Sequence, residues 1–309
     1  MGQPVILVDA YSQIYRGYYA VRELTDQQGR PSNAIFALSR FLMKLENEMP
    51  SQLGAFVADK DKCGFRLEIA PDYKANRSPM PDELKAQTDT IFELVNAFGW
   101  NTISLSGYEA DDLIAAIAAD AGEREMRVIT PDKDISQIAT AKIKLLVPDR
   151  SGGTFECRGP EEILKKFGVT PTQMVDYLAL IGDTSDNIPG VSGVGPKTAA
   201  TLLAQFGSIA NMLKRIDEIK NERIRAKVAE SGDLLRKNIQ LINLKTDIPG
   251  SPWQPFETCL QRRAPDWEQV LRIAHERSLR TLSSEIEKMN DKTPPVVATS
   301  SEKKQPQLF

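Results

Sequence analysis

The stretch Val5-Ile6-Leu7-Val8-Asp9 consists of four apolar residues that end at a carboxylate, which is typical of a β-strand. Similar short runs follow at 55–58, 102–105, 127–130 and 143–147. Segments with the apolar spacing of helices lie between these runs. Strand–helix alternation at this spacing predicts an α/β fold, with a mostly parallel sheet that carries helices on both faces.

The helices have start and stop signals. Ser32 is a candidate N-cap for a helix stopped by Pro50, and Pro81 suits the first position of a helix that ends at Gly99. A third helix is expected over 113–121. From about residue 168 to about residue 289 helices are expected to dominate. The apolar spacing from Val270 to Ile286 predicts one last amphipathic helix.

Composition limits the chemistry. The 309 residues are 41% hydrophobic and 26% charged, which suits about two soluble domains. We expect a cytoplasmic protein with no membrane contact, because no apolar run approaches the ~20 residues of a membrane helix and the N-terminus lacks the features of a signal peptide. A single histidine, His275, and three dispersed cysteines argue against zinc clusters, disulfide frameworks and Ser-His-Asp triads.

Carboxylates gather after the predicted strands, at the edge where open parallel sheets place functional residues. A further pair is expected to share one helix face at i, i+3 spacing. The full set is Asp9, Asp59, Glu109, Asp111, Asp112, Asp132, Asp134, Asp183 and Asp186, of which the last two are the helical pair.

Each acid alone has an ordinary explanation, since acids complement helix N-termini and lone aspartates serve as turn residues. As a set, however, they would repel one another unless cations bind among them. Oxygen ligands without His or Cys favour Mg²⁺ or Mn²⁺ over zinc. Two such ions roughly 4 Å apart activate water and stabilise a leaving oxygen in phosphodiester cleavage. The residues therefore predict a metal-dependent nuclease.

The overall charge conceals basic regions. The formal net charge is −3, but with the nine acids set aside 39 Lys or Arg residues face 33 acids. Residues 190–237 hold nine basic residues against five acids. Such a surface suits nucleic acid, although salt-bridged helix surfaces would explain it equally well.

Two basic segments are candidate phosphate sites. Between 190 and 199, Gly193 and Gly195 permit a tight turn before a helix that starts at Pro196, where N–H groups and Lys197 would hold a phosphate. A plain packing corner is the alternative.

The second segment, 65–77, carries Arg66, Lys74 and Arg77 towards the acidic edge, where they would clamp a scissile phosphate. Tyr73 offers a face for stacking an unpaired base. The alternative is a surface loop that is merely basic.

Several motifs occur in an order that resembles the 5′ nuclease domain of bacterial DNA polymerase I, within the flap endonuclease superfamily. They are Val-Asp-Ala at 8–10 with Tyr15-Arg16, Tyr-Lys-Ala-Asn-Arg at 73–77, Gly-Tyr-Glu-Ala-Asp-Asp at 107–112, Thr-Pro-Asp-Lys-Asp at 130–134, Gly-Asp-Thr-Ser-Asp-Asn-Ile-Pro-Gly at 182–190 and Gly-Val-Gly-Pro-Lys-Thr-Ala at 193–199. The resemblance extends from Val5 to about Met289 and is expected to describe a free-standing nuclease, because no polymerase follows.

The resemblance implies three parts. Residues 1–167 would form a PIN-like nuclease core with an arch segment at about 60–90. Residues 168–288 would form an all-helical, helix-three-turn-helix DNA-binding part, with a helix-hairpin-helix at about 188–205 that holds K⁺. Residues 289–309 would be a disordered tail.

It also implies residue roles. Asp59, Glu109, Asp111, Asp112 and Asp132, with Asp9 close by, would hold one Mg²⁺ or Mn²⁺, and Asp134, Asp183 and Asp186 a second. Lys74 and Arg77 would contact the scissile phosphate, with Asp132 and Asp134 assigned as catalytic. DNA contacts would come from Arg16, Arg66, Tyr73, Gly193, Gly195, Lys197 and Thr198.

The implied activity is that of a 5′-3′ exonuclease and 5′-flap endonuclease, a hydrolase that leaves a 5′-phosphate. Its substrates would be DNA with flaps, nicks or recessed 5′ ends, and RNA–DNA hybrids, in primer removal and repair. A monomer associated with the nucleoid is expected. The last five residues resemble a sliding-clamp-binding peptide, with Gln305, Leu308 and Phe309 as its contacts.

Two rival functions remain open at this point. A non-catalytic adaptor could bind branched DNA and the clamp, but it would have no need to keep nine self-repelling acids. A PIN-type ribonuclease toxin is usually shorter and lacks the glycine hairpin.

Overall fold

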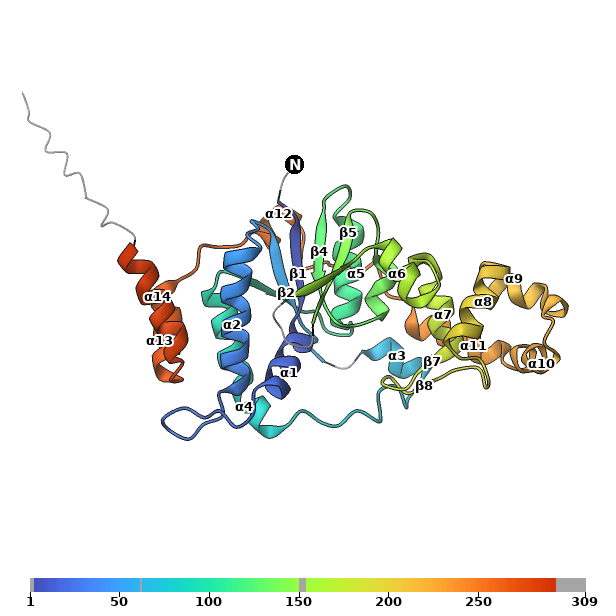
Figure 1. Ribbon diagram of the computed structural model, residues 1–309, viewed down its shortest axis with the longest axis horizontal. Coiled ribbons are helices and arrows are strands. Elements are labelled where there is room, and N and C mark those ends of the chain that lie inside the picture. The colour runs from blue at the N-terminus through green and yellow to red at the C-terminus, as the bar shows by residue number, and fades with distance from the viewer. Residues whose placement is uncertain (1–2, 62, 150–153, 293–309) are drawn as a thin grey trace, which may run out of the picture.

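Six strands form a central sheet in the order β3-β2-β1-β4-β5-β6, in a computed structural model that describes residues 3–61, 63–149 and 154–292 (Figure 1). All neighbouring strands are parallel except β5 and β6. The sheet strands are β1 (Val5–Asp9), β2 (Gly54–Val57), β3 (Asn101–Ile103), β4 (Met126–Ile129), β5 (Ile143–Pro148) and β6 (Phe155–Arg158). The predicted mostly parallel sheet is confirmed, and β6 is an addition to it.

The strand order creates a crevice at the carboxyl edge of β1. The chain leaves β1 towards β2 and β3 on one side, and then crosses to β4 and β5 on the other side. Ligands of open α/β sheets bind where the direction of the connections reverses in this way. The fold therefore places the residues that follow β1 and β4 beside one another.

Helices occupy most of the connections. They are α1 (Ala10–Ala20), α2 (Asn33–Glu48), α3 (Gly64–Ile69), α4 (Asp82–Ala97), α5 (Ala110–Asp120), α6 (Pro160–Phe167), α7 (Met174–Ile181), α8 (Pro196–Phe206), α9 (Ile209–Lys214), α10 (Glu222–Glu230), α11 (Gly232–Ile242), α12 (Phe256–Leu260), α13 (Trp267–Glu276) and α14 (Arg280–Lys292). Three 3₁₀ turns, η1 (Asp134–Ile138), η2 (Pro171–Gln173) and η3 (Ile216–Glu218), complete the set of helical elements in the described residues.

Helix boundaries differ from the predictions in local detail. Ser32 precedes α2 without a side-chain capping bond, and Pro81 is the N-cap of α4 rather than its first residue. The single last helix predicted from Val270 to Ile286 is wrong. It is divided into α13 and α14 at Ser278, which has a φ of 57°. Both helices pack on the same core, so the apolar spacing continues across the break.

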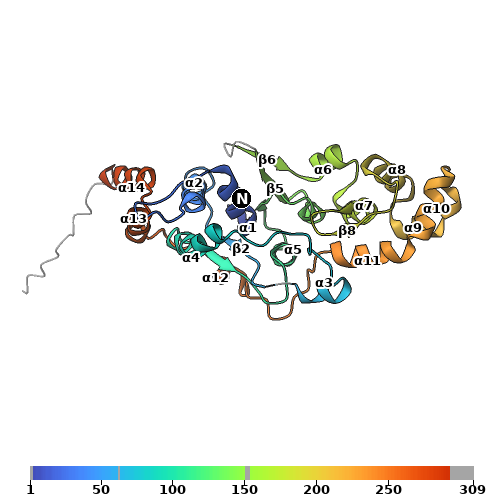
Figure 2. The same ribbon diagram turned by 90° about the horizontal axis from the view of Figure 1, so that it is seen from below.

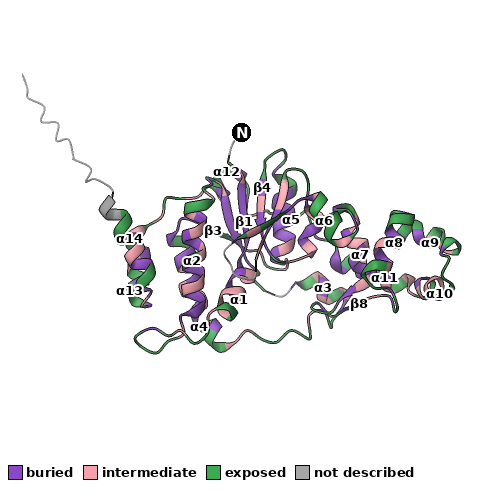
Figure 3. Cartoon of the chain, in the orientation of Figure 1, coloured by how far each residue is buried: buried purple, intermediate pink, exposed green. Residues whose placement is uncertain are grey.

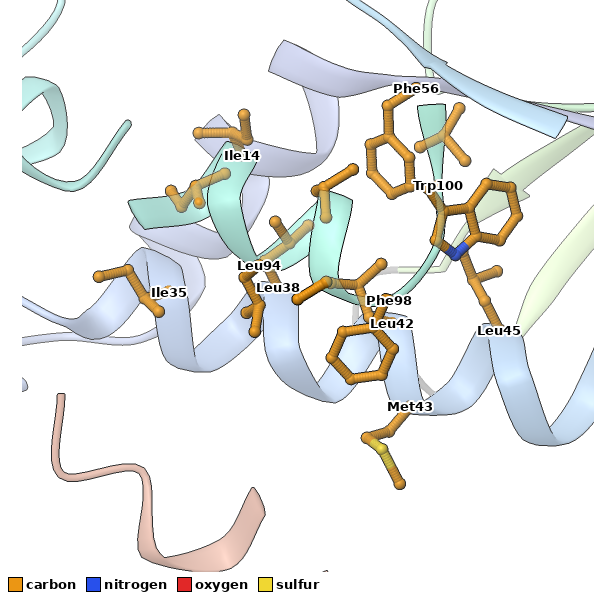
Figure 4. Packing of buried hydrophobic residues seen from close by; sticks show 14 of the residues in the cluster. Ile14, Ile35, Leu38, Leu42, Met43, Leu45, Phe56, Leu94, Phe98 and Trp100 are labelled. Atoms are coloured by element: carbon orange, nitrogen blue, oxygen red, sulfur yellow. The ribbon is translucent and has the colours of Figure 1, made fainter. Parts of the chain in front are cut away.

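Helices cover both faces of the sheet, as predicted. On one face, Ile6 and Val8 of β1 pack with residues of α1, α2 and α4, and α13 and α14 join the same cluster. In Figure 4, Leu42 of α2 lies beside Phe98, and Leu38 of α2 lies beside Leu94 in this core. Buried residues follow the strands and the inward sides of these helices (Figure 3).

The other face packs against α5 and a returning segment. Val5 and Leu7 of β1 contact the α5 cluster, which also includes Leu244, Trp253 and other buried residues between 244 and 260. The indole nitrogen of Trp253 donates to Asp120 Oδ2 at 2.8 Å. The chain thus returns from the helical part to complete the core on this face of the sheet.

Helices α7 to α11 form a second core at one end of the molecule, whereas α13 and α14 lie at the other end (Figures 1 and 2). The predicted helical part, 168–288, extends beyond this core. The second core stops near Ile242, and the buried apolar residues between Leu244 and Ile286 pack on the sheet or its helices.

The segment predicted as an arch, about 60–90, contains α3 and the start of α4. Between them, residues 70–81 include a series of turns and no helix. Ala70 and Tyr73 pack into the second core, so this segment joins the two cores.

Within the described ranges, the helices are too short or too polar to cross a bilayer.

Removal of the Trp253 side chain tests whether the returning segment belongs to the core. Trp253 is fully buried, so Trp253→Ala should lower the free energy of unfolding by about 3–5 kcal/mol. Denaturant unfolding of the wild type and the variant measures this difference. A loss below about 1 kcal/mol would contradict a structural role for residues 244–260.

Candidate active site

Acidic side chains line the crevice at the carboxyl edge of β1, β2 and β4. Asp9 ends β1, while Asp59 and Asp132 follow β2 and β4. Asp9 also caps α1, where it accepts from Ser12 N at 3.2 Å, and it accepts from Thr130 Oγ1 at 2.9 Å. These bonds fix the Asp9 carboxylate between β1 and β4.

The start of α5 supplies further acids. Glu109 is the N-cap of α5, and Asp111 follows in its first turn. The backbone N–H of Ala110 donates to Asp59 Oδ1 at 2.6 Å, so the helix terminus holds the carboxylate from β2. This contact brings the acids of the second strand and of α5 together.

These acids share one cavity of about 520 Å³. Its lining includes five of the predicted metal ligands, which are Asp9, Asp59, Glu109, Asp111 and Asp132. Tyr11, Ser12, Tyr15, Lys60, Asp61, Lys74, Arg77, Met80 and Ala110 complete it.

Asp134, Asp183 and Asp186 form a second acidic group next to the cavity. The pKa of Asp134 is raised well above its ordinary value by burial and by the charges of Asp132, Asp183 and Asp186. Asp183 lies in β7 (Gly182–Asp183), which pairs with β8 (Ile188–Pro189), and Asp186 lies in the turn between them. The prediction that these two acids share a helix face is wrong, although they do reach the same site.

The carboxylates are crowded enough to disfavour ionisation. Burial raises the pKa of Asp9 to about 6, and it also raises the pKa of Asp59. The pKa of Asp111 is raised by burial and by the negative charges of Asp132 and Asp9. The pKa of Asp132 is raised by burial and by nearby acids. The cluster therefore requires positive charge to stay ionised at neutral pH.

Three protein cations supply part of that charge. Lys74 Nζ lies 2.6 Å from Glu109 Oε1, Arg77 Nη2 lies 2.5 Å from Asp186 Oδ1, and Lys133 Nζ lies 3.0 Å from Asp183 Oδ2. Burial would lower the pKa of Lys74, but Glu109 and Asp186 raise it above its ordinary value. All three cations therefore stay charged at neutral pH.

In the part of the chain that the structure describes, no three Asp, Glu, His or Cys side chains are already arranged as a metal-ligand group. The chemistry of the donor set nevertheless fits divalent cations, because it consists of oxygen atoms alone. Asp134 Oδ1 is buried without a hydrogen-bond partner, so it has a lone pair free for a cation.

Asp112 and Arg66 form a buried ion pair with each other and do not line the acidic cavity. Arg66 is 1% exposed and makes two bonds to Asp112, at 2.5 Å and 2.8 Å. Asp112 also accepts from the backbone N–H groups of Glu109 and Lys245. The two opposite charges compensate each other inside the protein. The structure therefore supports neither a metal contact for Asp112 nor a DNA contact for Arg66.

Tyr73 is also placed differently from the prediction. Its ring is 7% exposed and belongs to the second core, so no face is free to stack on a base. Its hydroxyl lies within hydrogen-bond distance of Glu109 Oε2 at 3.0 Å and Asp186 Oδ2 at 3.1 Å. Tyr73 therefore bridges the two acidic groups.

Sequence reasoning missed several residues at the site. Lys133 lies between the predicted ligands Asp132 and Asp134, and this position in the sequence was the only indication that it belongs to the site. Tyr11 and Tyr15 line the acidic cavity on α1, and Tyr15 stacks on Tyr19 with ring centroids 6.4 Å apart. The i, i+4 spacing of these tyrosines could have shown that they share a helix face.

The glycine turn before α8 lines a separate cavity of about 690 Å³. Gly193 has a φ of 82°, Gly195 is the N-cap of α8, and Pro196 begins that helix as predicted. Gly193, Lys197 and Thr198 line this cavity together with Lys220 and Arg223, which belong to the basic run but were not singled out.

Arg16 lies outside both cavities. It donates to Asp149 O at 2.6 Å and lines a crevice between α1 and α2. The predicted clamp contacts Gln305, Leu308 and Phe309 lie outside the described residues, as does most of the predicted tail.

Comparisons with known proteins are consistent along the chain. Residues 4–168 match the family described as 5′-3′ exonuclease, N-terminal resolvase-like domain, and residues 169–266 match 5′-3′ exonuclease, C-terminal SAM fold. A 5′-3′ exonuclease of Aquifex aeolicus is 34% identical over 285 residues, which are 92% of this chain and 95% of that protein.

Longer relatives match over part of their length. The thermostable DNA polymerase I of Thermus thermophilus is 37% identical over 247 residues, which are 79% of this chain. The match spans 29% of that polymerase, so the chain covers less than a third of it.

Solved structures share the fold. The T5 5′-exonuclease with bound zinc has a TM-score of 0.63 at 20% identity and covers 92% of this chain and 98% of its own. The catalytic core of Rad2 in complex with DNA also has a TM-score of 0.63, at 19% identity, over 93% of this chain and 92% of its own.

The buried pair predicts unequal effects of substituting adjacent acids. Asp112→Ala should lower the free energy of unfolding by about 3–5 kcal/mol, because the buried Arg66 charge loses both hydrogen bonds to Asp112 and keeps only the 3.4 Å contact with Glu109 Oε2 as an ion pair. Asp111→Asn should not destabilise the metal-free protein, because it removes a repelling charge. Denaturant unfolding in EDTA compares the two, and similar losses would contradict the separation of their roles.

The raised pKa of Asp9 predicts a pH dependence of stability. Between the ordinary value of 3.8 and about 6, the metal-free native state retains a proton that the unfolded chain has released. The free energy of unfolding therefore falls as pH rises through this window, by ~3 kcal/mol from Asp9 alone. In EDTA, Asp9→Asn should gain stability relative to the wild type from pH 4 to about pH 6. A pH-independent difference would contradict this account.

Proposed function

The chain belongs to the 5′-3′ exonuclease family, and we propose that it is a divalent-metal-dependent nuclease that hydrolyses phosphodiester bonds and leaves a 5′-phosphate. The observation that carries the proposal is the convergence of eight acids at one crevice beside Lys74 and Arg77. Repulsion among these carboxylates destabilises the metal-free protein, and divalent metal ions bound among them would relieve it.

The two acidic groups divide the metal ligands. Asp9, Asp59, Glu109, Asp111 and Asp132 would hold one Mg²⁺ or Mn²⁺ in the cavity, and Asp134, Asp183 and Asp186 would hold a second. When bound, such ions lower the pKa of a water molecule and stabilise charge on the leaving oxygen.

The protein side chains then position the phosphodiester. Release of Lys74 from Glu109, and of Arg77 from Asp186, would free both cations for the non-bridging oxygens of the scissile phosphate. Their charge opposes the negative charge that develops there in the transition state. Tyr73 keeps Glu109 and Asp186 in place through its hydroxyl.

The helical part would hold the duplex. The cavity lined by Gly193, Lys197, Thr198, Lys220 and Arg223 presents basic groups and a helix N-terminus, which bind phosphates without reading bases. The catalytic core of Rad2, which shares this fold, is in complex with a DNA substrate, and this supports DNA as the ligand of this chain.

We further propose 5′ flaps, nicks and recessed 5′ ends as substrates, together with RNA–DNA hybrids, in primer removal and repair. The acidic crevice and the basic cavity lie on different cores, which suits DNA with both a free 5′ end and a duplex. K⁺ in the glycine turn, association with the nucleoid, a monomeric state and clamp docking through Gln305, Leu308 and Phe309 remain predictions.

A labelled 5′-flap duplex tests the activity. The wild type should cut it with Mg²⁺ and not with EDTA, leaving a 5′-phosphate. Asp183→Asn should lower kcat by on the order of a hundred-fold or more while DNA binding is kept, because one metal ligand is lost and the DNA contacts are not.

Glu125→Gln is the matched control, since Glu125 is an exposed acid that precedes β4 at the opposite edge of the sheet. It should cut like the wild type. Binding without cutting by the wild type would favour a non-catalytic adaptor, and cleavage of single-stranded RNA alone would favour a ribonuclease. Equal loss of binding and cutting in Asp183→Asn would give that residue a structural role.

A further inference from the structure

The segment 72–77 is fastened to the turn 184–187 by a set of hydrogen bonds, which we call the staple. The two stretches are more than 100 residues apart in the chain. The staple bonds are Lys74 N to Asp186 O at 3.0 Å, Asn76 Nδ2 to Thr184 O at 2.5 Å, Arg77 Nε to Ser185 O at 3.3 Å, and Asn187 Nδ2 to Asp72 O at 2.8 Å and to Asp72 Oδ2 at 3.3 Å.

Both stretches adopt an unusual backbone conformation at the staple. Lys74 has a φ of 56° and Asn187 a φ of 59°. Left-handed backbone is uncommon for a lysine, and it persists where surrounding contacts hold it. Its consequence here is that the Lys74 N–H bonds to Asp186 O while the Lys74 ammonium reaches Glu109.

The staple lies outside the reacting centre. Asn76 and Asn187 are exposed and do not line the acidic cavity, whereas Lys74 and Arg77 do. Two asparagine side chains therefore hold the backbone that carries the two cations. In this structure their side chains are connected to the cavity through that backbone.

The staple also differs chemically from the ion pairs beside it. Metal ions and a phosphate would compete with Lys74 for Glu109 and with Arg77 for Asp186, so those pairs would break when substrate binds. The staple consists of hydrogen bonds donated by carboxamide, backbone and guanidinium N–H groups, nearly all to carbonyl oxygens. Neither a metal ion nor a phosphate competes strongly for these hydrogen bonds. Thus it can keep the segment in place after the ion pairs are released.

We propose that Asn187, with Asn76, is a positioning residue that holds Lys74 and Arg77 in reach of the scissile phosphate during the reaction. The proposal rests on the proposed nuclease function and adds to it a role for residues that do not line the acidic cavity.

Asn187→Gly tests the proposal. Glycine takes the same left-handed backbone without strain and removes only the carboxamide. With a 5′-flap duplex and Mg²⁺, kcat should fall by about ten- to a hundred-fold, because misplacement of a clamp by about 1 Å costs this much. KM, the melting temperature and its rise with Mg²⁺ should change little.

Glu23→Gly is the matched control, because Glu23 is exposed, has a φ of 48° and makes no side-chain hydrogen bond in the described residues. It should cut like the wild type. In a Lys74→Ala, Arg77→Ala background, Asn187→Gly should cause no further loss, because the groups it positions are gone.

The outcomes separate the two proposals. If the wild type does not cut any 5′-flap duplex with Mg²⁺, the nuclease function is wrong and the positioning role is wrong with it. If the wild type cuts and Asn187→Gly matches Glu23→Gly, only the positioning role is overturned. It is also overturned if the full loss persists in the Lys74→Ala, Arg77→Ala background.

Discussion

Electrostatic repulsion among carboxylates at one edge of the sheet is the constraint on which the rest of the structure depends. The strand order brings the ends of β1 and β4 together, and α5 and the β7–β8 turn add their own acids. Burial then penalises each negative charge, as the raised pKa of Asp9 and Asp111 indicates. A protein without a use for cations would gain stability by replacing these acids. Their presence in one crevice is therefore the strongest functional signal in the chain.

Two kinds of positive charge meet this constraint. The pairing of Arg66 with Asp112 is permanent, because both side chains are buried and separating them would leave two charges uncompensated inside the protein. Lys74, Arg77 and Lys133 sit nearer the surface and pair with acids that metal ions would also bind. The pair of Arg66 and Asp112 thus fastens α3 to the start of α5. The other three stabilise the acids before metal ions arrive, and two of them stand where a phosphate would need them.

The sequence predicted the sheet and most of the acidic site because both have local signals. A run such as 5–9 shows its strand character and its terminal Asp9 within five residues. The pairing of Asp112 could not be predicted, because adjacent residues on a helix point in different directions and Arg66, its partner, is distant in the chain. The staple had no local signal, since its partners are far apart in the chain. The break at Ser278 was hidden because both flanking helices pack on one core.

The central claim is that the crevice collects acids in order to bind divalent cations. The most direct test is anomalous diffraction from crystals of the protein grown with Mn²⁺. We predict at least one Mn²⁺ within about 2.5 Å of carboxylate oxygens of Asp111 and Asp132. Mn²⁺ found only on other surfaces, with Lys74 still paired to Glu109 in a crevice that holds no ion, would contradict the account.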